Sequence, residues 1–415
     1  MQVSSKRISL RRTFCGENVS PMGSRGPVLG RERTGWIMNR AWIELDAEAL
    51  AHNIRQYQSI LPGGCRIMGV VKADAYGHGA GAVAPFLESL GVGFFATATL
   101  DEAVRLREYG VKSEILILGY SAPSSFAALV EYDLTQTATC PEHAAQLEAY
   151  GREHGGRLKA HIAVDTGMHR IGFLPEDGEV IRRFYQSGDL RVTGIYSHLC
   201  VADTEEEEHV AFSIGQAERF RELVNTLRSQ GTDLGTVHLL SSYAAVNYPE
   251  YAYDYARLGI LMFGVKSDPG DFLRQDLHPR PVMTLKAHIT SVREIGPGET
   301  VSYGRIFRAE RPTKIASVAI GYADGIPRCL SGGKLRAIVH GQYVRGAGRI
   351  CMDQLMLDVT GVDGVQVGDE AVFIGRDGDC VIYAEELAQN SGSITNELFS
   401  RLGARLEGRQ FTKRP

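Results

Sequence analysis

Several polar residues follow directly on short apolar runs, where a buried strand would end. Lys72 comes straight after RIMGVV (66–71), and an amine in that place is partly desolvated, which lowers its pKa and makes it a candidate nucleophile. The alternative is a lysine whose stem lies on apolar surface while its ammonium reaches solvent. Other polar side chains near later apolar runs favour the chemical role of Lys72. Arg170 and Ser242 follow such runs, His198 ends one, and Arg257 opens the last.

These residues need a scaffold that brings strand ends together, and the sequence alternates strands with helices in the required way. Helical patterns cover 46–61, where Asp46 is the N-cap, and also 81–91 and 207–230. A further helical stretch starts with the capping box of Thr99 and Glu102. Eight strand-like runs lie near 66–71, 94–97, 114–118, 134–137, 160–164, 192–197, 237–240 and 258–263. Alternation of this kind predicts a parallel sheet.

Eight strand–helix units predict an α/β fold with a (β/α)8 TIM-like barrel, which typically takes ~250 residues. A doubly wound open sheet is the alternative, but no GxGxxG follows the first strand to support a dinucleotide-binding fold. After about Thr284 the strand-like runs continue with Gly-rich turns and without long helices. We therefore expect a disordered N-terminal extension at 1–40, a barrel at 41–284 and a mostly β domain at 285–415.

The composition is that of an ordinary globular protein and narrows the range of partners. The 415 residues carry 45 basic and 49 acidic side chains, so the net charge of −4 gives no support to nucleic-acid binding. No apolar run approaches the ~18 residues of a membrane helix, so no membrane partner is expected. The seven cysteines form no CxxC pair. We therefore expect neither a disulfide framework nor a metal site, and a cytoplasmic location.

In a barrel, functional groups gather at the C-terminal ends of the strands, and the last two strand ends often hold a phosphate. Ser241, Ser242, Gly259 and Ile260 fall there and provide hydroxyl and backbone N–H donors. A phosphate pocket opposite a lysine at the barrel mouth suits a phosphorylated aldehyde held as an imine, which is pyridoxal 5'-phosphate. We therefore predict that Lys72 binds this cofactor.

Six short motifs resemble those of bacterial alanine racemases, in the order of that family: VVKADAYGHG, VDTGMHRIG, ARLGILMFG, VSYGRIF, IGYADGIPR and GRICMDQ. The resemblance covers about Ala41 to Glu407, and six motifs in order are far more specific than any one of them. It implies a pyridoxal-phosphate enzyme of fold type III that interconverts L- and D-alanine. It further implies a head-to-tail homodimer in which each active site takes residues from both subunits.

The resemblance also implies roles for individual residues. Lys72 would bind the cofactor and act as one catalytic base, and Tyr303 from the second subunit would act as the other. Contacts to the cofactor are implied for Tyr76, His198, Ser242, Arg257, Gly259 and Ile260. Contacts to the amino-acid substrate are implied for Arg170, Tyr322, Met352 and Asn396.

These residue types suit racemisation, which removes a proton from one face of Cα and returns it on the other. A phenol is protonated at neutral pH unless a nearby cation favours the phenolate, and the family pattern implies a relay from Tyr303 through His198 and Arg257. An arginine stays cationic and can only donate, so a pyridine nitrogen facing Arg257 stays unprotonated. The weaker electron sink that results is compatible with racemisation and disfavours transamination.

Two positions depart from the family pattern. Many alanine racemases have a carbamylated lysine seven residues before the carboxylate-binding arginine, and this chain has Ala163 there, so Arg170 must be oriented in another way. Asn396 stands where the family commonly has a tyrosine beside the substrate side chain. An amide is smaller and can hydrogen-bond a hydroxyl, and the serine-racemising relatives also have asparagine there. We therefore expect that serine is also a substrate, although Asn396 could simply open a helix.

Three other functions stay open at this point. Serine rather than alanine could be the main substrate. A non-catalytic pyridoxal-phosphate barrel is a second alternative, but such proteins usually lack a second domain, and this chain has about 130 residues of it. An amino-acid decarboxylase is the third alternative. Arg257 argues against it, because decarboxylases that share the barrel usually place a glutamate there.

Overall fold

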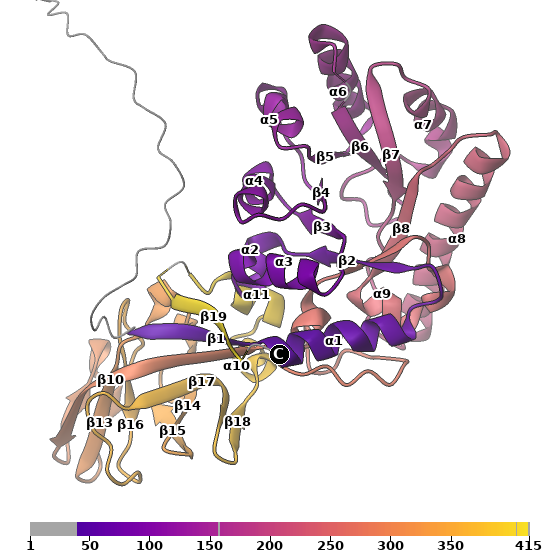
Figure 1. The fold of residues 1–415 in the computed structure, drawn as a ribbon. Coiled ribbons are helices and arrows are strands. Elements are labelled where there is room, and N and C mark those ends of the chain that lie inside the picture. The colour runs from indigo at the N-terminus through magenta and orange to yellow at the C-terminus, as the bar shows by residue number, and fades with distance from the viewer. Residues whose placement is uncertain (1–39, 157, 404, 414–415) are drawn as a thin grey trace, which may run out of the picture. The chain divides into compact units, whose positions relative to one another are not determined.

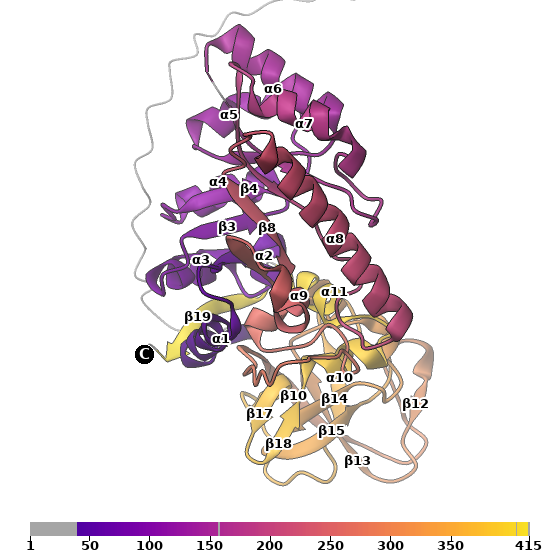
Figure 2. The same cartoon turned by 90° about the vertical axis from the view of Figure 1, so that its right-hand side faces the viewer.

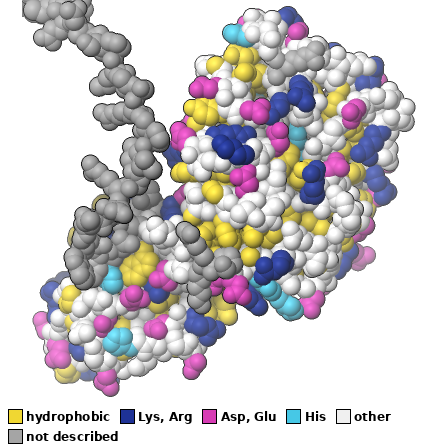
Figure 3. All heavy atoms as spheres, in the orientation of Figure 1, with side chains coloured by type: hydrophobic (Ala, Val, Ile, Leu, Met, Phe, Trp, Pro, Cys, Tyr) yellow, Lys and Arg dark blue, Asp and Glu magenta, His cyan; other side chains and the backbone are white. Residues whose placement is uncertain are grey.

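The computed structural model describes residues 40–156, 158–403 and 405–413, which are coloured in Figure 1. Apart from Arg40, the extension predicted to be disordered at 1–40 lies outside these residues. Among the described residues, no helix is long and apolar enough to cross a membrane. Lysine, arginine and carboxylate side chains are interspersed over the face shown in Figure 3.

Eight strands form a closed parallel barrel, as the sequence predicts. Each strand is hydrogen-bonded to the next in chain order, and the last closes the ring on the first, with Arg257 opposite Met68. The strands are β2 (Arg66–Val70), β3 (Phe94–Thr97), β4 (Glu114–Ile117), β5 (Thr135–Ala138), β6 (Leu158–Ala163), β7 (Leu190–Tyr196), β8 (Thr236–Ser241) and β9 (Tyr255–Leu258).

Helices lie outside the barrel (Figures 1 and 2). The Asp46 carboxylate caps the first one by accepting the Ala49 N–H at 2.9 Å, and Thr99 and Glu102 form the predicted capping box. The helices are α1 (Ala47–Ile60), α3 (Ala80–Ser89), α4 (Leu100–Glu108), α5 (Phe126–Glu131), α6 (Pro141–His154), α7 (Gly178–Tyr185), α8 (Glu207–Ser229) and α9 (Ser242–Asn247).

Side chains fill the barrel, so it is a packed core and not a pore. A buried cluster inside it takes residues from several strands: Met68, Val70, Phe94, Ala96, Leu116, Ala163, Tyr196 and Tyr255. A larger cluster includes the residues that face the surrounding helices. The strands therefore read as continuous apolar runs, because both of their faces are covered.

The last barrel strand differs from its prediction. The apolar run 258–263 is predicted as a strand, whereas β9 ends at Leu258 and Ile260–Phe263 form a 3-10 turn, η4. Gly259 separates the two with φ of −121° and ψ of −112°, which lies outside the strand region. All four residues of the turn are buried. The apolar run thus indicates that these residues are buried, but burial alone does not distinguish a strand from a turn.

The C-terminal region forms a nine-stranded sheet, in agreement with the predicted β domain. Its order is β18-β17-β14-β15-β16-β13-β10-β1-β19, and β10 also pairs with β17. The bounds are β10 (Met283–Ile295), β13 (Thr313–Val318), β14 (Arg336–Val339), β15 (Gln342–Gly346), β16 (Leu355–Asp358), β17 (Glu370–Asp377) and β18 (Cys380–Ile382). A small pair, β11 (Thr300–Val301) and β12 (Phe307–Arg308), and two helices, α10 (Ala384–Asn390) and α11 (Thr395–Ser400), complete the region.

The same sheet takes strands from both ends of the described chain. β1 (Ala41–Asp46) is antiparallel to β10 and parallel to β19 (Glu407–Lys413), and Figure 1 shows the three strands side by side. Residues 41–46 therefore pair within the sheet and not within the barrel. The ranges 41–284 and 285–415 for the two domains stay a prediction.

Candidate active site

A cavity of about 470 Å³ opens at the C-terminal ends of the barrel strands. It is lined by residues in or after the C-terminal ends of β2, β3, β4, β6, β7, β8 and β9, together with Asn396 at the start of α11. The structure thus brings together these predicted site residues: Lys72, Tyr76, Arg170, His198, Ser242, Arg257, Gly259, Ile260 and Asn396. Side chains that sequence reasoning did not assign also line it, among them Asp203, Tyr243 and Ser267.

Lys72 lies at the edge of this cavity and is half-buried. Burial lowers the pKa of its ammonium, and the nearby guanidinium of Arg170 and, more weakly, that of Arg257 act in the same direction, while the Glu102 carboxylate opposes them. The amine is therefore neutral over a wider pH range than a surface lysine. A neutral amine is the form that attacks a carbonyl or accepts a proton.

The chain turns in a left-handed sense immediately after Lys72. In the short element α2 (Lys72–Tyr76), the four residues Ala73 to Tyr76 have φ between 51° and 55°. Each such residue costs roughly 1–2 kcal/mol. The turn is held by the Glu102 carboxylate, which accepts the Ala73 N–H at 2.7 Å, and by the Asp74 carboxylate, which accepts the Ala80 N–H at 2.7 Å. The orientation of Lys72 thus depends on contacts made by its neighbours.

Arg257 is buried, and acceptors fix its guanidinium. Nη1 donates to Nδ1 of His238 at 2.7 Å, and Nη2 donates to the Ser197 and Leu239 carbonyls at 2.7 and 3.0 Å and to Nδ1 of His198 at 3.1 Å. Burial lowers its pKa to about 10, and Arg170 acts in the same direction. Arg257 remains a cation at neutral pH with its donors aimed by these contacts.

A chain of buried histidines continues from Arg257 into the barrel. Because Arg257 can only donate, Nδ1 of His238 accepts, and its Nε2 donates to Nδ1 of His161 at 3.0 Å. Burial, followed by the charge of Arg257, lowers the pKa of His161 to about 3 and holds that of His238 well below its usual range. Tyr196 stacks on His238 with ring centroids 4.8 Å apart. The chain is therefore neutral and fixed in one tautomer.

Sequence reasoning missed His161 and His238, although a signal was present. Each lies within an apolar run predicted as a strand, and an imidazole inside such a run has to find a buried partner. His198, which was predicted, is also neutral, since burial and then the charge of Arg257 lower its pKa to about 3.

Ser242, Gly259 and Tyr76 form a compact corner of the cavity. The Gly259 N–H donates to the Ser242 hydroxyl oxygen at 2.7 Å, which leaves the hydroxyl hydrogen free to donate elsewhere. The Tyr76 hydroxyl lies where a side chain at 259 would be, since a Cβ there would approach it to 2.5 Å. Glycine is therefore required at 259. Burial raises the pKa of Tyr76, so its hydroxyl stays a donor at neutral pH.

Asn396 and Ala163 depart from the family pattern, and both positions leave room for other groups. Oδ1 of Asn396 is buried and has no hydrogen-bond partner within the described part of the chain. A second cavity of about 20 Å³ is lined by Ala163 and Arg170, and it has space for roughly one water molecule.

Three predicted site residues lie in the C-terminal region, away from the cavity of their own chain. Tyr303 is in the 3-10 turn η5 (Tyr303–Arg305), Tyr322 is in η6 (Tyr322–Asp324), and Met352 precedes β16. Their exposed fractions are 72%, 39% and 52%, which is unusual for two aromatic side chains and a methionine. Tyr322 and Met352 lie on two loops that are hydrogen-bonded to each other, since the Tyr322 N–H donates to the Cys351 carbonyl at 3.0 Å.

Comparison with known proteins agrees with this arrangement over nearly all of the described residues. The family model "Alanine racemase, N-terminal domain" matches residues 45–267, and "Alanine racemase, C-terminal domain" matches residues 282–410. This chain belongs to the alanine racemase family. Enzymes of this family use pyridoxal phosphate.

Similar curated racemases differ in their own length. An amino-acid racemase from Enterococcus faecalis is 40% identical over 89% of this chain and 51% of its own length, and a serine/alanine racemase from Enterococcus gallinarum is 37% identical over 91% and 54%. This alanine racemase-family chain thus spans about half the length of those two relatives. It spans 94% of alanine racemase 1 from Clostridium acetobutylicum, at 37% identity over 88% of this chain.

A solved structure shows the same fold. The alanine racemase from Bacillus anthracis, whose structure contains bound L-Ala-P, matches with a TM-score of 0.81 and 30% identity, covering 90% of this chain and 95% of that one.

The cavity of this racemase-family chain fits pyridoxal phosphate in its donor set. Lys72 offers an amine to an aldehyde, and Arg257 offers donors to a ring nitrogen that accepts. The corner of Ser242, Tyr76 and Gly259 offers two hydroxyls around a position that a Cβ would fill.

Proposed function

We propose that this chain is a pyridoxal-phosphate-dependent racemase that interconverts L- and D-alanine and also accepts serine. One observation carries the proposal: in a chain of the alanine racemase family, a lysine, a donor-only arginine and a hydroxyl-lined corner converge on one cavity at the mouth of the barrel. Convergent polar groups in a cavity of this size are typical of a small-molecule site.

The residues that would hold the cofactor follow from their chemistry. Lys72 would bind its aldehyde, and Tyr76, Ser242 and the Ile260 N–H would bind its phosphate. The Gly259 N–H would bind the phosphate by exchanging its contact with the Ser242 hydroxyl. Arg257 would donate to the ring nitrogen and, being cationic, would not pass a proton to it. When bound, the cofactor withdraws electrons from the substrate and so acidifies Cα–H. Arg170 would bind the substrate carboxylate, as would the Met352 backbone of the second subunit.

Two bases on opposite faces of Cα would perform the inversion. Lys72 would take or give the proton at its Nζ, which burial and neighbouring cations favour in the neutral form. Tyr303 would act at its hydroxyl on the other face, supplied by a second copy of the chain. Its exposed fraction of 72% supports this assignment, because a tyrosine so exposed has surface to offer a partner. Tyr322 would line the mouth of the same shared site.

Asn396 favours serine as a further substrate. Asn396 lines the cavity, its Oδ1 is buried without a hydrogen-bond partner among the described residues, and a substrate hydroxyl that reached this oxygen would satisfy it. Relatives at 37% identity include a protein named serine/alanine racemase, which supports the same proposal.

Purified protein supplied with pyridoxal phosphate and either L-alanine or L-serine tests the function directly. We expect the D-enantiomer to form without release of CO2, whereas CO2 would indicate a decarboxylase and no product would indicate a non-catalytic carrier. Lys72→Ala is expected to remove both the activity and the visible absorbance of the lysine-bound cofactor. Lys159→Ala is a suitable control, since that lysine pairs with Glu114 and Asp133 at the N-terminal end of β6.

A further inference from the structure

A stretch near the C-terminus, residues 399–403, lies between two turns that carry predicted site residues. On one side is α2, where Gly77 has φ of 74° and a Cβ would collide with the Phe399 carbonyl oxygen. On the other side is η6, which Gly325 ends with φ of 110°, and a Cβ there would lie 2.6 Å from the Arg401 carbonyl oxygen. Glycines thus let both turns press against the same piece of backbone.

Arg409 of β19 connects this stretch to α2. Its guanidinium forms an ion pair with Asp74, and Nη2 donates to the carbonyls of Leu402 and Gly403 at 2.9 and 3.0 Å. The stem of Arg409 packs on Gly79, where a Cβ would lie 2.9 Å from its Cδ. The arginine side chain is 16% exposed, so the ion pair is sheltered on its cationic side.

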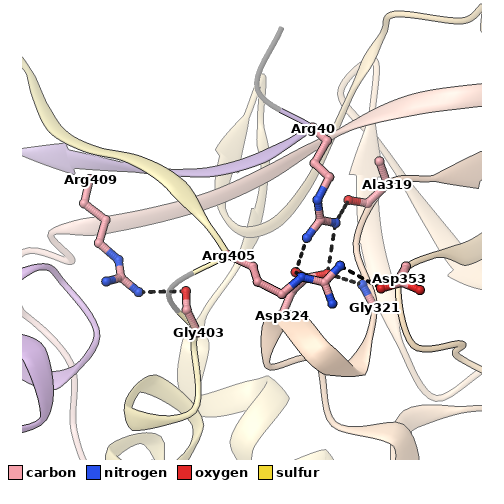
Figure 4. Close-up of polar contacts among 8 residues, drawn as sticks. All are labelled: Arg40, Ala319, Gly321, Asp324, Asp353, Gly403, Arg405 and Arg409. Atoms are coloured by element: carbon pink, nitrogen blue, oxygen red, sulfur yellow. Dashed lines mark hydrogen bonds and ion pairs between the residues drawn. The ribbon is translucent and has the colours of Figure 1, made fainter. Parts of the chain in front are cut away.

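Arg405, two residues beyond this stretch, pairs with Asp324 of η6, as Figure 4 shows. The Asp324 carboxylate is fully buried, accepts the Gly321 N–H at 2.9 Å, and is paired with Arg40. Arg405 reaches the same carboxylate, with Nε 3.5 Å from Oδ1, and pairs with Asp353 at 2.6 Å. Arg405 therefore connects two loops that are also held to each other by backbone hydrogen bonds.

We propose that Arg405 and Arg409 are positioning residues that hold two parts of the proposed site from one C-terminal segment. Arg409 holds the turn that carries Lys72, and Arg405 holds the loops that carry Tyr322 and Met352. Neither arginine lines the cavity, so each acts through a carboxylate on the turn that it holds. The inference rests on the proposed function, which makes Lys72 the cofactor-binding residue.

The Asp74 carboxylate explains why Arg409 should affect Lys72 in particular. One oxygen accepts the Ala80 N–H and closes the left-handed turn, and the other pairs with Arg409. The Arg409 guanidinium fixes the orientation of this carboxylate and holds it near β19. Both effects are lost when the guanidinium is removed. The left-handed turn then has one support fewer, and Lys72 moves with it.

Hydrogen–deuterium exchange on the cofactor-free protein tests the Arg409 contact independently of catalysis. In Arg409→Gln, amides in 73–80 are expected to exchange about 10-fold faster than in the wild type, as for the loss of one charge-assisted hydrogen bond. Asp74→Asn keeps an acceptor for Ala80 and is expected to give the same result. Arg182→Gln is the control, because it removes an arginine that pairs with Glu179 on α7.

The holoenzyme supplies the second measurement. A displaced Lys72 is expected to lower kcat about 10- to 100-fold, to change KM less, and to weaken the visible circular dichroism of the bound cofactor. Unchanged exchange in 73–80, or exchange that rises equally in all barrel strands of both variants, would overturn the positioning role. A wild-type protein without racemase activity would instead overturn the proposed function, while leaving the exchange result interpretable.

The matching experiment for Arg405 concerns the other turn. In Arg405→Gln, exchange is expected to rise at the amides of 321–325, which include the donors to Asp324 and to the Cys351 and Met352 carbonyls. The amides of 73–80 should be unaffected in this variant. A rise in 73–80 without a rise in 321–325 would contradict the assignment of one arginine to each turn.

Discussion

The amide of Asn396 changes what the cavity wall can recognise. A tyrosine, expected there from the family resemblance, would bring a large ring beside the substrate side chain, whereas asparagine leaves space and a buried acceptor without a partner within the described residues. A buried polar group without a partner is costly, and a ligand hydroxyl would remove that cost. Under the proposed function, the range of substrates would depend on one residue that takes no part in proton transfer.

Asn396→Tyr is therefore expected to lower kcat/KM for serine about 10-fold more than for alanine, because the hydroxyl loses both space and partner. Initial rates of D-serine and D-alanine formation measure this ratio. Asn390→Tyr, at an exposed position at the end of α10, controls for the added ring. Equal losses on the two substrates would contradict a role in specificity.

The first turn of α4 supports the left-handed turn after Lys72, although the two are far apart in sequence. The Glu102 carboxylate accepts the N–H groups of Ala98 and Thr99, as a capping box requires, and also that of Ala73 in the left-handed turn. The Thr99 hydroxyl completes the cap by accepting the Glu102 N–H, and this contact does not involve the left-handed turn. Thr99 therefore contributes only to the helix cap, whereas Glu102 contributes both to the cap and to the turn that carries Lys72.

Thr99→Ala and Glu102→Ala are each expected to lower the free energy of unfolding by about 1 kcal/mol, the usual cost of a lost cap. Only Glu102→Ala should also weaken pyridoxal-phosphate binding, since the Ala73 N–H loses its acceptor and the turn of Lys72 loosens. Urea unfolding and cofactor titration measure the two effects. Weaker cofactor binding in Thr99→Ala of the same size would show that the cap acts only through the helix.

Elements with a clear hydrophobic period could be predicted from the sequence, and those defined by tertiary contacts could not. The strand at 94–97 and the helix started by Thr99 are where the local pattern places them. The pairing of β1 with β10 and β19 depends on residues far apart in sequence, and local pattern does not encode it. The left-handed turn after Lys72 lacks glycine at 73–76, so its sequence gives no sign of positive φ.

The candidate site shows the same division. Lys72 and Ser242 could be predicted because they follow apolar runs, and Arg257 because it opens one, since the fold places strand ends together. The hydrogen bond from His238 to His161 could not, since it joins β8 to β6, which lie on either side of β7 and are far apart in sequence. Motif resemblance supplied Tyr303, which no local pattern distinguishes from an ordinary surface tyrosine.

At the scale of the whole molecule, the described residues include both proposed bases but do not bring them together in one cavity. Lys72 lies in the barrel cavity, and Tyr303 is exposed on η5 of the C-terminal region and does not line that cavity. A two-fold symmetric pair of chains would satisfy this arrangement twice, since an isologous interface gives each cavity the Tyr303 of the other chain. The proposed dimer is thus required by the proposed chemistry.

Mixing two inactive variants tests that requirement. Lys72→Ala and Tyr303→Ala homodimers are each expected to be nearly inactive, because both bases are needed. After unfolding and refolding together in equal amounts, about half of the dimers should be mixed, and each mixed dimer has one site with both bases intact. Activity should therefore recover to about a quarter of the wild-type value for the same total protein.

The double variant Lys72→Ala/Tyr303→Ala, refolded with wild type, forms mixed dimers whose two sites each lack one base. It should thus reduce activity where the single variants restore it. If no activity returns on mixing the single variants, although chromatography shows mixed dimers, then both bases act within one chain and the shared site is wrong.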